Sequence, residues 1–249
     1  MRRRGLLVDL SAALTALLVA SSALAQVDTF AKANQEYAAG QFKEAIADYE
    51  TLVQKKEWSA NLFYDLGNAY FRAQDFGKAI LNYERALALD RHHAEAQANL
   101  RVARDQARAL RLQQSQVERY VRAGSPNQYA IAAAAMFWIG IFIGASLLFG
   151  QRRSTSAITL SILSLSIFIA LGVAIYAMEN GSGGRGVAIV TKANVTARVA
   201  TADTSSSVLA VPAGSEIKVL SERGEWVYAA LPNNLRGWIP ANNAEPVRL

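Results

Sequence analysis

Two long apolar runs separate the polar parts of the chain, at Tyr129–Phe149 and at Ala157–Met178. Each has about 21 residues and contains no Asp, Glu, Lys, Arg or His, so a helix of this length would cross a hydrocarbon core of roughly 30 Å. The loop between the runs carries Arg152 and Arg153 and no acidic residue, which favours the cytoplasmic side. The pattern predicts a transmembrane hairpin over residues 127–178, with both flanking parts of the chain on the other side of the membrane.

Small residues recur at intervals of four within both runs. Gly140 and Gly144 form a G-x-x-x-G pair in the first run, and Ser166, Ala170 and Ala174 form a similar row in the second. Such rows let helix backbones approach closely in lipid. We expect them to pack the two spans against each other, and contact with a partner membrane protein is the alternative.

The first 25 residues have the three parts of an export signal. Arg2–Arg4 form a positive start, Leu10–Ala20 is a short apolar core, and Ala23–Ala25 supplies the small-x-small pattern that precedes cleavage. An uncleaved anchor is the alternative, although Asp9 shortens the apolar stretch. Either interpretation exports the chain from residue 26 onward, in agreement with the orientation that the loop arginines predict.

A repeat with a period of 34 residues occupies residues 28–93. The matched positions are Ala33 with Gly67, Asn34 with Asn68, Tyr37 with Phe71, Phe42 with Phe76, Ala45 with Ala79, Ile46 with Ile80, Tyr49 with Tyr83 and Glu50 with Glu84. Period and pattern resemble the tetratricopeptide repeat, whose unit is a helix–turn–helix. The second copy holds the signature residues Leu66, Gly67, Tyr70, Ala79, Tyr83 and Ala86. The first copy departs from the signature at Glu36, where an aromatic residue is usual, and the second at Arg91, where proline is usual.

Two such repeats leave the end of their shared core open, so a further helix is expected to cover it. Residues Ala94–Arg122 have apolar positions at helical spacing in their first half and become rich in arginine afterwards. We expect one capping helix that continues as a stalk and ends near Pro126, where proline interrupts it before the membrane. The all-α repeat domain is therefore expected to span residues 26–126.

The resemblance implies that the first helix of each repeat lines a concave groove for a protein partner. Asn34 and Asn68 hold equivalent positions on these helices. An amide side chain both donates and accepts hydrogen bonds, which suits capture of an extended peptide backbone. The alternative is that these asparagines only cap a helix or meet solvent. The predicted protein-binding residues of the groove are Asn34, Tyr37, Tyr64, Asn68, Phe71 and Arg72.

After a glycine-rich stretch at residues 179–186, interpreted as a flexible linker, the chain alternates short β-rich runs with turns. The expected strands are Val187–Thr191, Asn194–Val199, Val208–Val211, Glu216–Leu220, Trp226–Leu231 and Gly237–Ile239. Residues 187–249 resemble the bacterial SH3-like barrel, most clearly in Gly224-Glu225-Trp226 and Arg236-Gly237-Trp238-Ile239-Pro240. Trp226 and Tyr228 are predicted to form an aromatic binding shelf, although Trp226 and Trp238 as core residues are the alternative. Asn243 stands where eukaryotic SH3 domains stack a tyrosine on their ligand, which argues against polyproline binding.

Charge and residue chemistry exclude several classes of function. The net charge of +6 is spread over the leader, the loop and residues 91–126, so no compact basic face for nucleic acid is expected. The chain has no cysteine, and its two histidines, His92 and His93, are neighbours expected in a solvated turn. Thiol chemistry, a cysteine metal site and a phosphate-binding glycine loop are all missing. We predict that the protein is not an enzyme and has no cofactor and no metal site.

The order signal, tetratricopeptide repeats, two-span hairpin and SH3-like domain resembles the BatE proteins of the bacterial aerotolerance (Bat) operon. This resemblance implies an inner-membrane protein whose repeats and SH3-like domain lie in the periplasm. It also implies partners among other Bat proteins, some of which carry von Willebrand A domains. The resulting prediction is a scaffold that recruits protein partners through its repeats. An envelope sensor whose SH3-like domain binds cell-wall peptides is the alternative.

Overall fold

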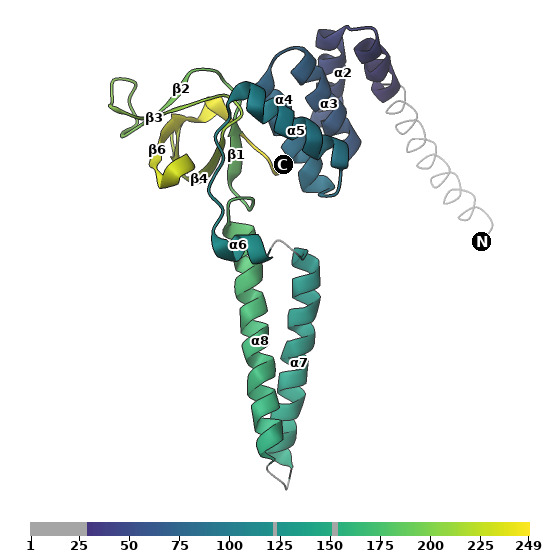
Figure 1. Ribbon diagram of the computed structural model, residues 1–249, viewed down its shortest axis with the longest axis vertical. Helices are drawn as coiled ribbons and strands as arrows, with labels where there is room; N and C mark the ends of the chain where they lie inside the picture. Colours follow the sequence, from purple (N-terminus) through teal and green to yellow (C-terminus); the bar gives the residue numbers. More distant parts are fainter. Residues whose placement is uncertain (1–28, 122–123, 151–153) are drawn as a thin grey trace, which may run out of the picture.

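The computed structural model describes residues 29–121, 124–150 and 154–249. Figure 1 shows a group of helices beside a β-sheet domain, with a pair of antiparallel helices extending away from both. The leader at residues 1–25 and the loop residues Arg152 and Arg153 lie outside the described residues, so their roles stay predictions.

The repeat part consists of a helix over residues 29–38 and four further helices: α2 (Phe42–Gln54), α3 (Ala60–Arg72), α4 (Phe76–Leu89) and α5 (Ala94–Ala107). Side chains with the right chemistry define the starts of these helices. Ser59 accepts a hydrogen bond from the backbone N–H of Leu62 at the start of α3, and Asp75 does the same for Lys78 in α4. The predicted helix–turn–helix units are therefore present.

The 34-residue period recurs in the packing of these helices. Tyr49 and Tyr83 are equivalent second-helix residues, and both are 1% exposed. The three buried residues of α5 lie one period after buried residues of α3: Ala96 after Leu62, Leu100 after Leu66 and Ala103 after Ala69. Helix α5 thus occupies the place of the first helix of a third repeat, whose second helix is absent from the described residues.

The predicted continuous helix from Ala94 to Arg122 is wrong. Helix α5 ends at Ala107, because Arg108 has a left-handed backbone with φ of +50°. The chain then leaves the helix axis, and the carbonyl of Leu110 accepts a hydrogen bond from the backbone N–H of Glu216 at 2.9 Å. A short helix, α6 (Gln116–Val121), follows before the apolar helices. Pairing with the sheet domain therefore replaces the expected stalk.

The two apolar runs form α7 (Pro126–Phe149) and α8 (Thr155–Asn180), which pack against each other as a hairpin (Figure 1). Both helices are long and apolar enough to cross a membrane, and their surfaces are largely uncovered within the chain. Pro126 starts α7 next to a capping box in which Ser125 and Gln128 exchange hydrogen bonds. A capped start at this point separates the apolar helix from the polar repeat part.

The contact row of the hairpin differs from the expectation in the second span. Gly140 lies in the contact as expected, since a Cβ there would stand 2.9 Å from Leu165. Its partners on α8 are two serines: Ser161 donates to the carbonyl of Gly140 at 3.1 Å, and Ser164 donates to that of Met136 at 2.6 Å. The expected row of Ser166, Ala170 and Ala174 is wrong, because Ser166 and Ala170 are exposed and Ser166 bonds its own helix instead. The hydroxyls of Ser161 and Ser164 lie in the contact between the helices, where each finds a backbone carbonyl of α7 as acceptor.

The expected flexible linker is also wrong in part. Helix α8 includes Glu179 and Asn180, and the glycine-rich stretch after it is an ordered turn. The backbone N–H of Arg185 donates to the carbonyl of Glu179 at 2.6 Å, and the hydroxyl of Ser182 donates to Glu118 at 2.8 Å. These bonds order the turn between α8 and the sheet domain and connect it to α6.

The C-terminal domain is an antiparallel sheet of seven strands. The strands are β1 (Val187–Val190), β2 (Val195–Arg198), β3 (Ser207–Val211), β4 (Glu216–Arg223), β5 (Trp226–Ala230), β6 (Arg236–Pro240) and β7 (Ala244–Pro246). Six of them match expected strands, and β7 was not expected. The order β3-β2-β6-β5-β4-β1-β7 leaves β3 and β7 as the two ends, so the sheet is not a closed ring. Alternation along β5 and β6 buries Val227, Ala229 and Ile239 on one face.

Candidate protein-binding sites

The two repeat asparagines bond to tyrosines of the second helices. The hydroxyl of Tyr49 donates to Asn34 Oδ1 at 2.5 Å, and the hydroxyl of Tyr83 donates to Asn68 Oδ1 at 2.8 Å. Burial raises the pKa of both tyrosines above its ordinary value, so both hydroxyls stay protonated donors at neutral pH. Asn34 is exposed and Asn68 is half-buried, so both still present surface on the first helices, and only the expectation that they make no contact with the second helices is wrong. Each amide oxygen satisfies a buried hydroxyl, and Asn34 still has an exposed outer side.

Asn68 belongs to a larger polar cluster that connects two neighbouring first helices. Asn99 of α5 donates from Nδ2 to Asn68 Oδ1 at 2.9 Å and approaches the Tyr64 hydroxyl at 3.4 Å. Tyr64 also stacks near His93, with ring centroids 4.8 Å apart. This cluster orders the half-buried side of the face formed by α3 and α5.

His93 is not in a solvated turn, contrary to the expectation. Its Nδ1 accepts a hydrogen bond from the backbone N–H of Ala96 at 3.3 Å and so caps the start of α5. Half-burial against the Tyr64 ring explains why a histidine holds this position.

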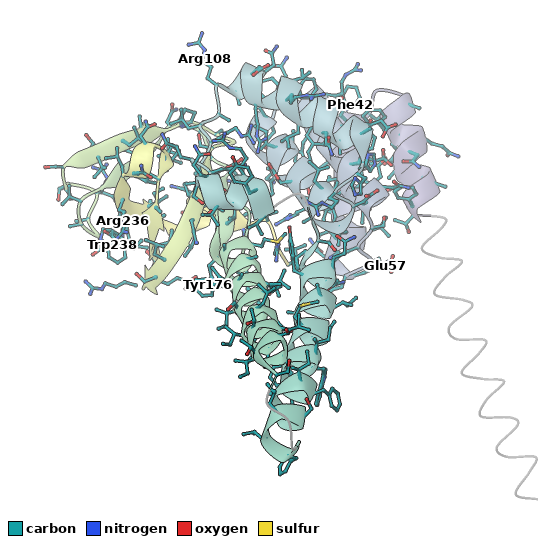
Figure 2. The ribbon with its side chains drawn as sticks, turned by 60° about the horizontal axis from the view of Figure 1, so that its bottom comes forward. Phe42, Glu57, Arg108, Tyr176, Arg236 and Trp238 are labelled. Carbon is teal, nitrogen blue, oxygen red and sulfur yellow. The ribbon has the colours of Figure 1, made fainter. Side chains whose placement is uncertain are left out.

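The other groove candidates pack partly against the turns of the repeats. Tyr37 makes an edge-to-face contact with Phe42 at 5.5 Å between centroids, and Phe71 makes the equivalent contact with Phe76 at 5.4 Å. Arg72 places its guanidinium 4.9 Å from the centroid of the Phe42 ring, and so connects the two repeats. Figure 2 shows Phe42 among the side chains of this region. All three candidates remain half-buried or exposed, so each still presents surface.

Two further residues of this face have features that the motif alone did not point out. Asp65 of α3 is half-buried, and burial raises its pKa to about 6, although His93 lowers it in part. Val102 of α5 is 49% exposed and lies one period after Asn68. Extending the 34-residue alignment into α5 would have found Val102, whereas the burial of Asp65 follows only from the packed helices.

The predicted shelf residues Trp226 and Tyr228 lie on one face of the sheet together with Trp238, and their role in binding stays a prediction. Tyr228 and Trp238 have ring centroids 5.0 Å apart, and both are half-buried together with Trp226. These three side chains lie on the face opposite Val227, Ala229 and Ile239. Trp226 and Trp238 are thus outside the core of the sheet.

A contact between repeats and sheet, absent from the sequence expectations, centres on Arg104 of α5. Its guanidinium forms short hydrogen-bonded ion pairs with Glu84 of α4 and with Glu216 of β4. Glu216 also accepts from the backbone N–H of Leu112 at 3.2 Å and lies 3.7 Å from Arg111. Arg104 and Glu216 are each 11% exposed in the side chain. Both side chains are largely shielded from water, so removal of either one leaves the charge of the other without its main partner.

A second buried arginine joins α4 to β7. Arg85 donates to the backbone carbonyl of Pro246 at 3.1 Å and lies 3.5 Å from Glu245. Burial lowers its pKa from the ordinary value, while Glu245 acts in the opposite direction. A cavity of about 170 Å³ beside it is lined by α2, α3, α4 and Glu245.

Apolar packing completes the same interface. Ile189 of β1 is fully buried within the core of the repeats, and Val247 packs against that core. Gly77 of α4 lies so close to the sheet that a Cβ there would stand 2.7 Å from the carbonyl oxygen of Thr191. The sheet domain therefore covers the helices where the second helix of a third repeat would otherwise lie.

Comparisons with known proteins support the repeats alone. Residues 33–74 match the family described as TPR repeat, and residues 60–93 match the family described as tetratricopeptide repeat. Together the matches cover the helices from residue 33 to the start of α5. A search of curated proteins gives no match.

Proposed function

We propose that this chain is a non-enzymatic membrane scaffold whose tetratricopeptide repeats recruit protein partners. The main observation in support is the pair of matched repeats, because tetratricopeptide repeats are suited to binding other proteins. The two apolar helices that follow the repeats have the length of membrane spans. On this proposal α7 and α8 anchor the chain in the bacterial inner membrane. The repeats and the SH3-like domain then lie in the periplasm.

The partner face is proposed to be the surface of the first helices. It combines the exposed side of Asn34, the aromatic side chains of Tyr37, Tyr64 and Phe71, and the apolar side chain of Val102. Hydrogen bonds within the face hold Asn68 and Asn99 in place, so their amides are positioned before a partner arrives. The proposed partners are proteins of a Bat-type complex, including proteins with von Willebrand A domains. This choice rests on the resemblance of the domain order to that of BatE proteins.

Site-specific crosslinking in the full chain tests this proposal. Deleting residues 26–126 is a poor test, because it uncovers Ile189 and leaves Glu216 without Arg104. A photoreactive residue at Asn61 or Val102, both exposed on first helices, is expected to capture the same membrane or periplasmic protein. The matched control is Lys43, exposed on a second helix. Equal capture from Lys43, or none from the first helices, contradicts the assignment.

The second candidate is an envelope sensor that binds cell-wall peptides. The observation in its favour is the half-buried cluster of Trp226, Tyr228 and Trp238. Purified cell wall would then retain the detergent-solubilised full chain, and a variant with Trp238→Ala would be released. A chain that fails to sediment with cell wall while crosslinking through Val102 supports the scaffold over the sensor.

A further inference from the structure

One face of the sheet gathers basic and aromatic side chains. We define the outer face as the side of β4, β5 and β6 opposite the sheet core. Strand register places Ser221, Tyr228 and Trp238 in one row across these strands, and Lys218, Ala230 and Arg236 in the next. Arg223 pairs with Trp226 at the far end and places its guanidinium 5.6 Å from the Trp238 ring. Figure 2 shows Arg236 and Trp238 at the periphery of the sheet domain.

The charge of this face has a single sign. Lys218, Arg223 and Arg236 lie on it, and Arg198 of β2 extends the middle row beside Trp238. No acidic residue occupies a register position of these rows. Glu216, the acidic residue two positions before Lys218, is buried and bound to Arg104. The outer face is therefore a basic surface with aromatic side chains between the charges.

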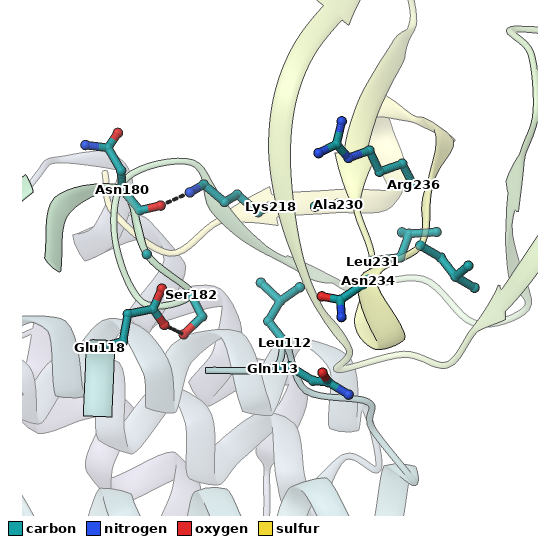
Figure 3. A pocket seen from close by; sticks show the side chains of 12 residues that line it. Leu112, Gln113, Glu118, Asn180, Ser182, Lys218, Ala230, Leu231, Asn234 and Arg236 are labelled. Atoms are coloured by element: carbon teal, nitrogen blue, oxygen red, sulfur yellow. Dashed lines mark hydrogen bonds between the residues drawn. The ribbon is translucent and has the colours of Figure 1, made fainter. Parts of the chain in front are cut away.

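The outer face begins at the end of a proposed membrane helix. The ammonium group of Lys218 donates to the backbone carbonyl of Asn180, the last residue of α8 (Figure 3). A cavity of about 250 Å³ opens at this point, bordered by Asn180, Lys218 and Arg236. Glu118 also borders this cavity, where it is hydrogen-bonded to Ser182. The row that holds Lys218 and Arg236 thus lies where α8 ends, which on the proposed topology is the edge of the hydrocarbon core of the membrane.

Neighbouring side chains mark the same level as a membrane–water interface. Tyr120 of α6 is 78% exposed, Val117 on the same short helix is also exposed, and Tyr176 is exposed one turn before the end of α8. Tyrosine at the end of a span is typical of the headgroup region. Helix α6 packs against α8, so these exposed side chains surround the point from which the sheet domain emerges.

We propose that the outer face of the sheet binds the anionic lipid headgroups of the same bilayer that holds α7 and α8. This inference rests on the proposed membrane hairpin. Phosphate-bearing headgroups complement the four basic side chains, and Trp226, Tyr228 and Trp238 have the amphipathic rings that favour the interface. The short turn after Asn180 and the Lys218 bond keep this face beside the bilayer, which favours lipid over a distant polymer.

Lipid contact at the outer face is measurable with a label, because the chain has no native cysteine. Ser221→Cys places a fluorophore in the middle row of the face, and Gln106→Cys places one on α5 in the repeats. Figure 2 shows Arg108, the residue at which α5 ends, on the side away from α8. Full-length protein is placed in nanodiscs of phosphatidylcholine, with or without phosphatidylglycerol, that contain a headgroup spin label as quencher. We expect quenching at position 221 that grows with phosphatidylglycerol, and little at position 106.

Charge reversal provides the decisive comparison. Each basic side chain near an anionic surface changes the population of the contact by about five-fold, so R223E/R236E is expected to abolish the effect of phosphatidylglycerol at position 221. The matched control is K43E/R101E, which makes the same charge change at exposed positions of the repeats. High salt is expected to weaken quenching in the parent.

Three results would overturn the inference. Quenching at position 221 that does not depend on phosphatidylglycerol, or that persists in R223E/R236E, contradicts contact between this face and anionic headgroups. A fluorescence change at position 221 with soluble cell-wall fragments but not with anionic lipid assigns the face to the other ligand. Alkaline extraction of the full chain from native membranes is run in parallel. Release by alkali contradicts the hairpin itself, whereas retention without quenching contradicts only the lipid contact.

Discussion

Arg104 of the repeats and Glu216 of the sheet form a buried ion pair across 112 residues of sequence. The pair links α5, where the repeats stop, to β4, and it forms on the side where Ile189 enters the repeat core. Repeats and sheet are therefore one structural unit above the apolar hairpin. A ligand that binds to the repeats or to the sheet therefore binds to a single unit that contains both parts.

Breaking this pair is expected to destabilise the whole unit. Arg104→Met removes the cation that Glu84 and Glu216 share and leaves only the exposed Arg111 near Glu216, which costs about 3 kcal/mol in the free energy of unfolding. Thermal unfolding of the full chain in detergent measures the loss. Arg101→Met, at an exposed position of the same helix, is the control and is expected to change little. If Glu216→Gln in the Arg104→Met background recovers no stability, the ion pair is not the cause.

Asn68→Ala is expected to destabilise the repeats by about 2 kcal/mol. It removes the acceptor of the Tyr83 hydroxyl, which then stays buried without a partner, and it also releases Asn99. Asn34→Ala removes one such bond and is expected to cost about 1 kcal/mol. Adding Tyr83→Phe to Asn68→Ala should recover part of the loss, because the orphaned hydroxyl is gone. Parent-like melting of Asn68→Ala would show that the amide serves partner binding alone.

Gly77→Ala tests the close approach of α4 to the sheet. A Cβ at this position meets the carbonyl oxygen of Thr191 at 2.7 Å, and backbone on both sides limits relaxation. The expected cost is about 1–3 kcal/mol, even though alanine normally stabilises a helix relative to glycine. Gly172→Ala, where no atom lies within 4 Å, is the control in α8. A stabilised Gly77→Ala variant would show that the two parts separate readily.

Asp65 is expected to make the stability of the folded repeats depend on pH. Burial raises its pKa to about 6 in the folded state, against about 3.9 in an unfolded chain, so the folded protein binds the extra proton between these values. The free energy of unfolding contributed by Asp65 therefore falls as pH rises from about 4 to 6, and the cost is complete above pH 6. Because water screens part of the side chain, about 1 kcal/mol is expected.

The readout for Asp65 is the difference between parent and Asp65→Asn, measured by urea unfolding across this pH range. Asparagine cannot titrate, so the variant should be the more stable one above pH 6 and lose its advantage near pH 4. Taking the difference removes the contributions of other carboxyl groups. A difference that is flat with pH would contradict the burial of the charge.

Topology is predicted by the leader and by the loop arginines. Alkaline phosphatase fused after Pro126 or after Leu249 is expected to be active, because the enzyme requires the oxidising side of the membrane. A fusion at Ser154, next to Arg152 and Arg153, is expected to be inactive. The measurement is phosphatase activity in intact cells, normalised to the amount of fusion protein. Reversed activities would place the repeats in the cytoplasm and contradict the proposed function.

The sequence by itself determined the local elements. Apolar length defined α7 and α8 to within a few residues, since a continuous apolar run of this length is enough to specify such a helix. The 34-residue period defined the helix pairs, because small and aromatic residues at Ala79 and Tyr83 serve contacts within one repeat. Alternation and turn residues defined six of the seven strands, and only the short β7, which pairs with β1 far along the chain, was missed.

Tertiary structure alone decided how those elements meet. The chain after Ala107 turns toward the sheet because Glu216 binds Arg104 and Leu110, and no local pattern contains that long-range contact. The asparagines point to Tyr49 and Tyr83 because a buried hydroxyl must find an acceptor, which periodicity does not specify. The outer face of the sheet became basic and aromatic only when strand register brought Lys218, Arg236 and Trp238 together beside the end of α8. Sequence fixes which contacts a short segment favours, whereas the folded chain selects among partners that are distant in sequence.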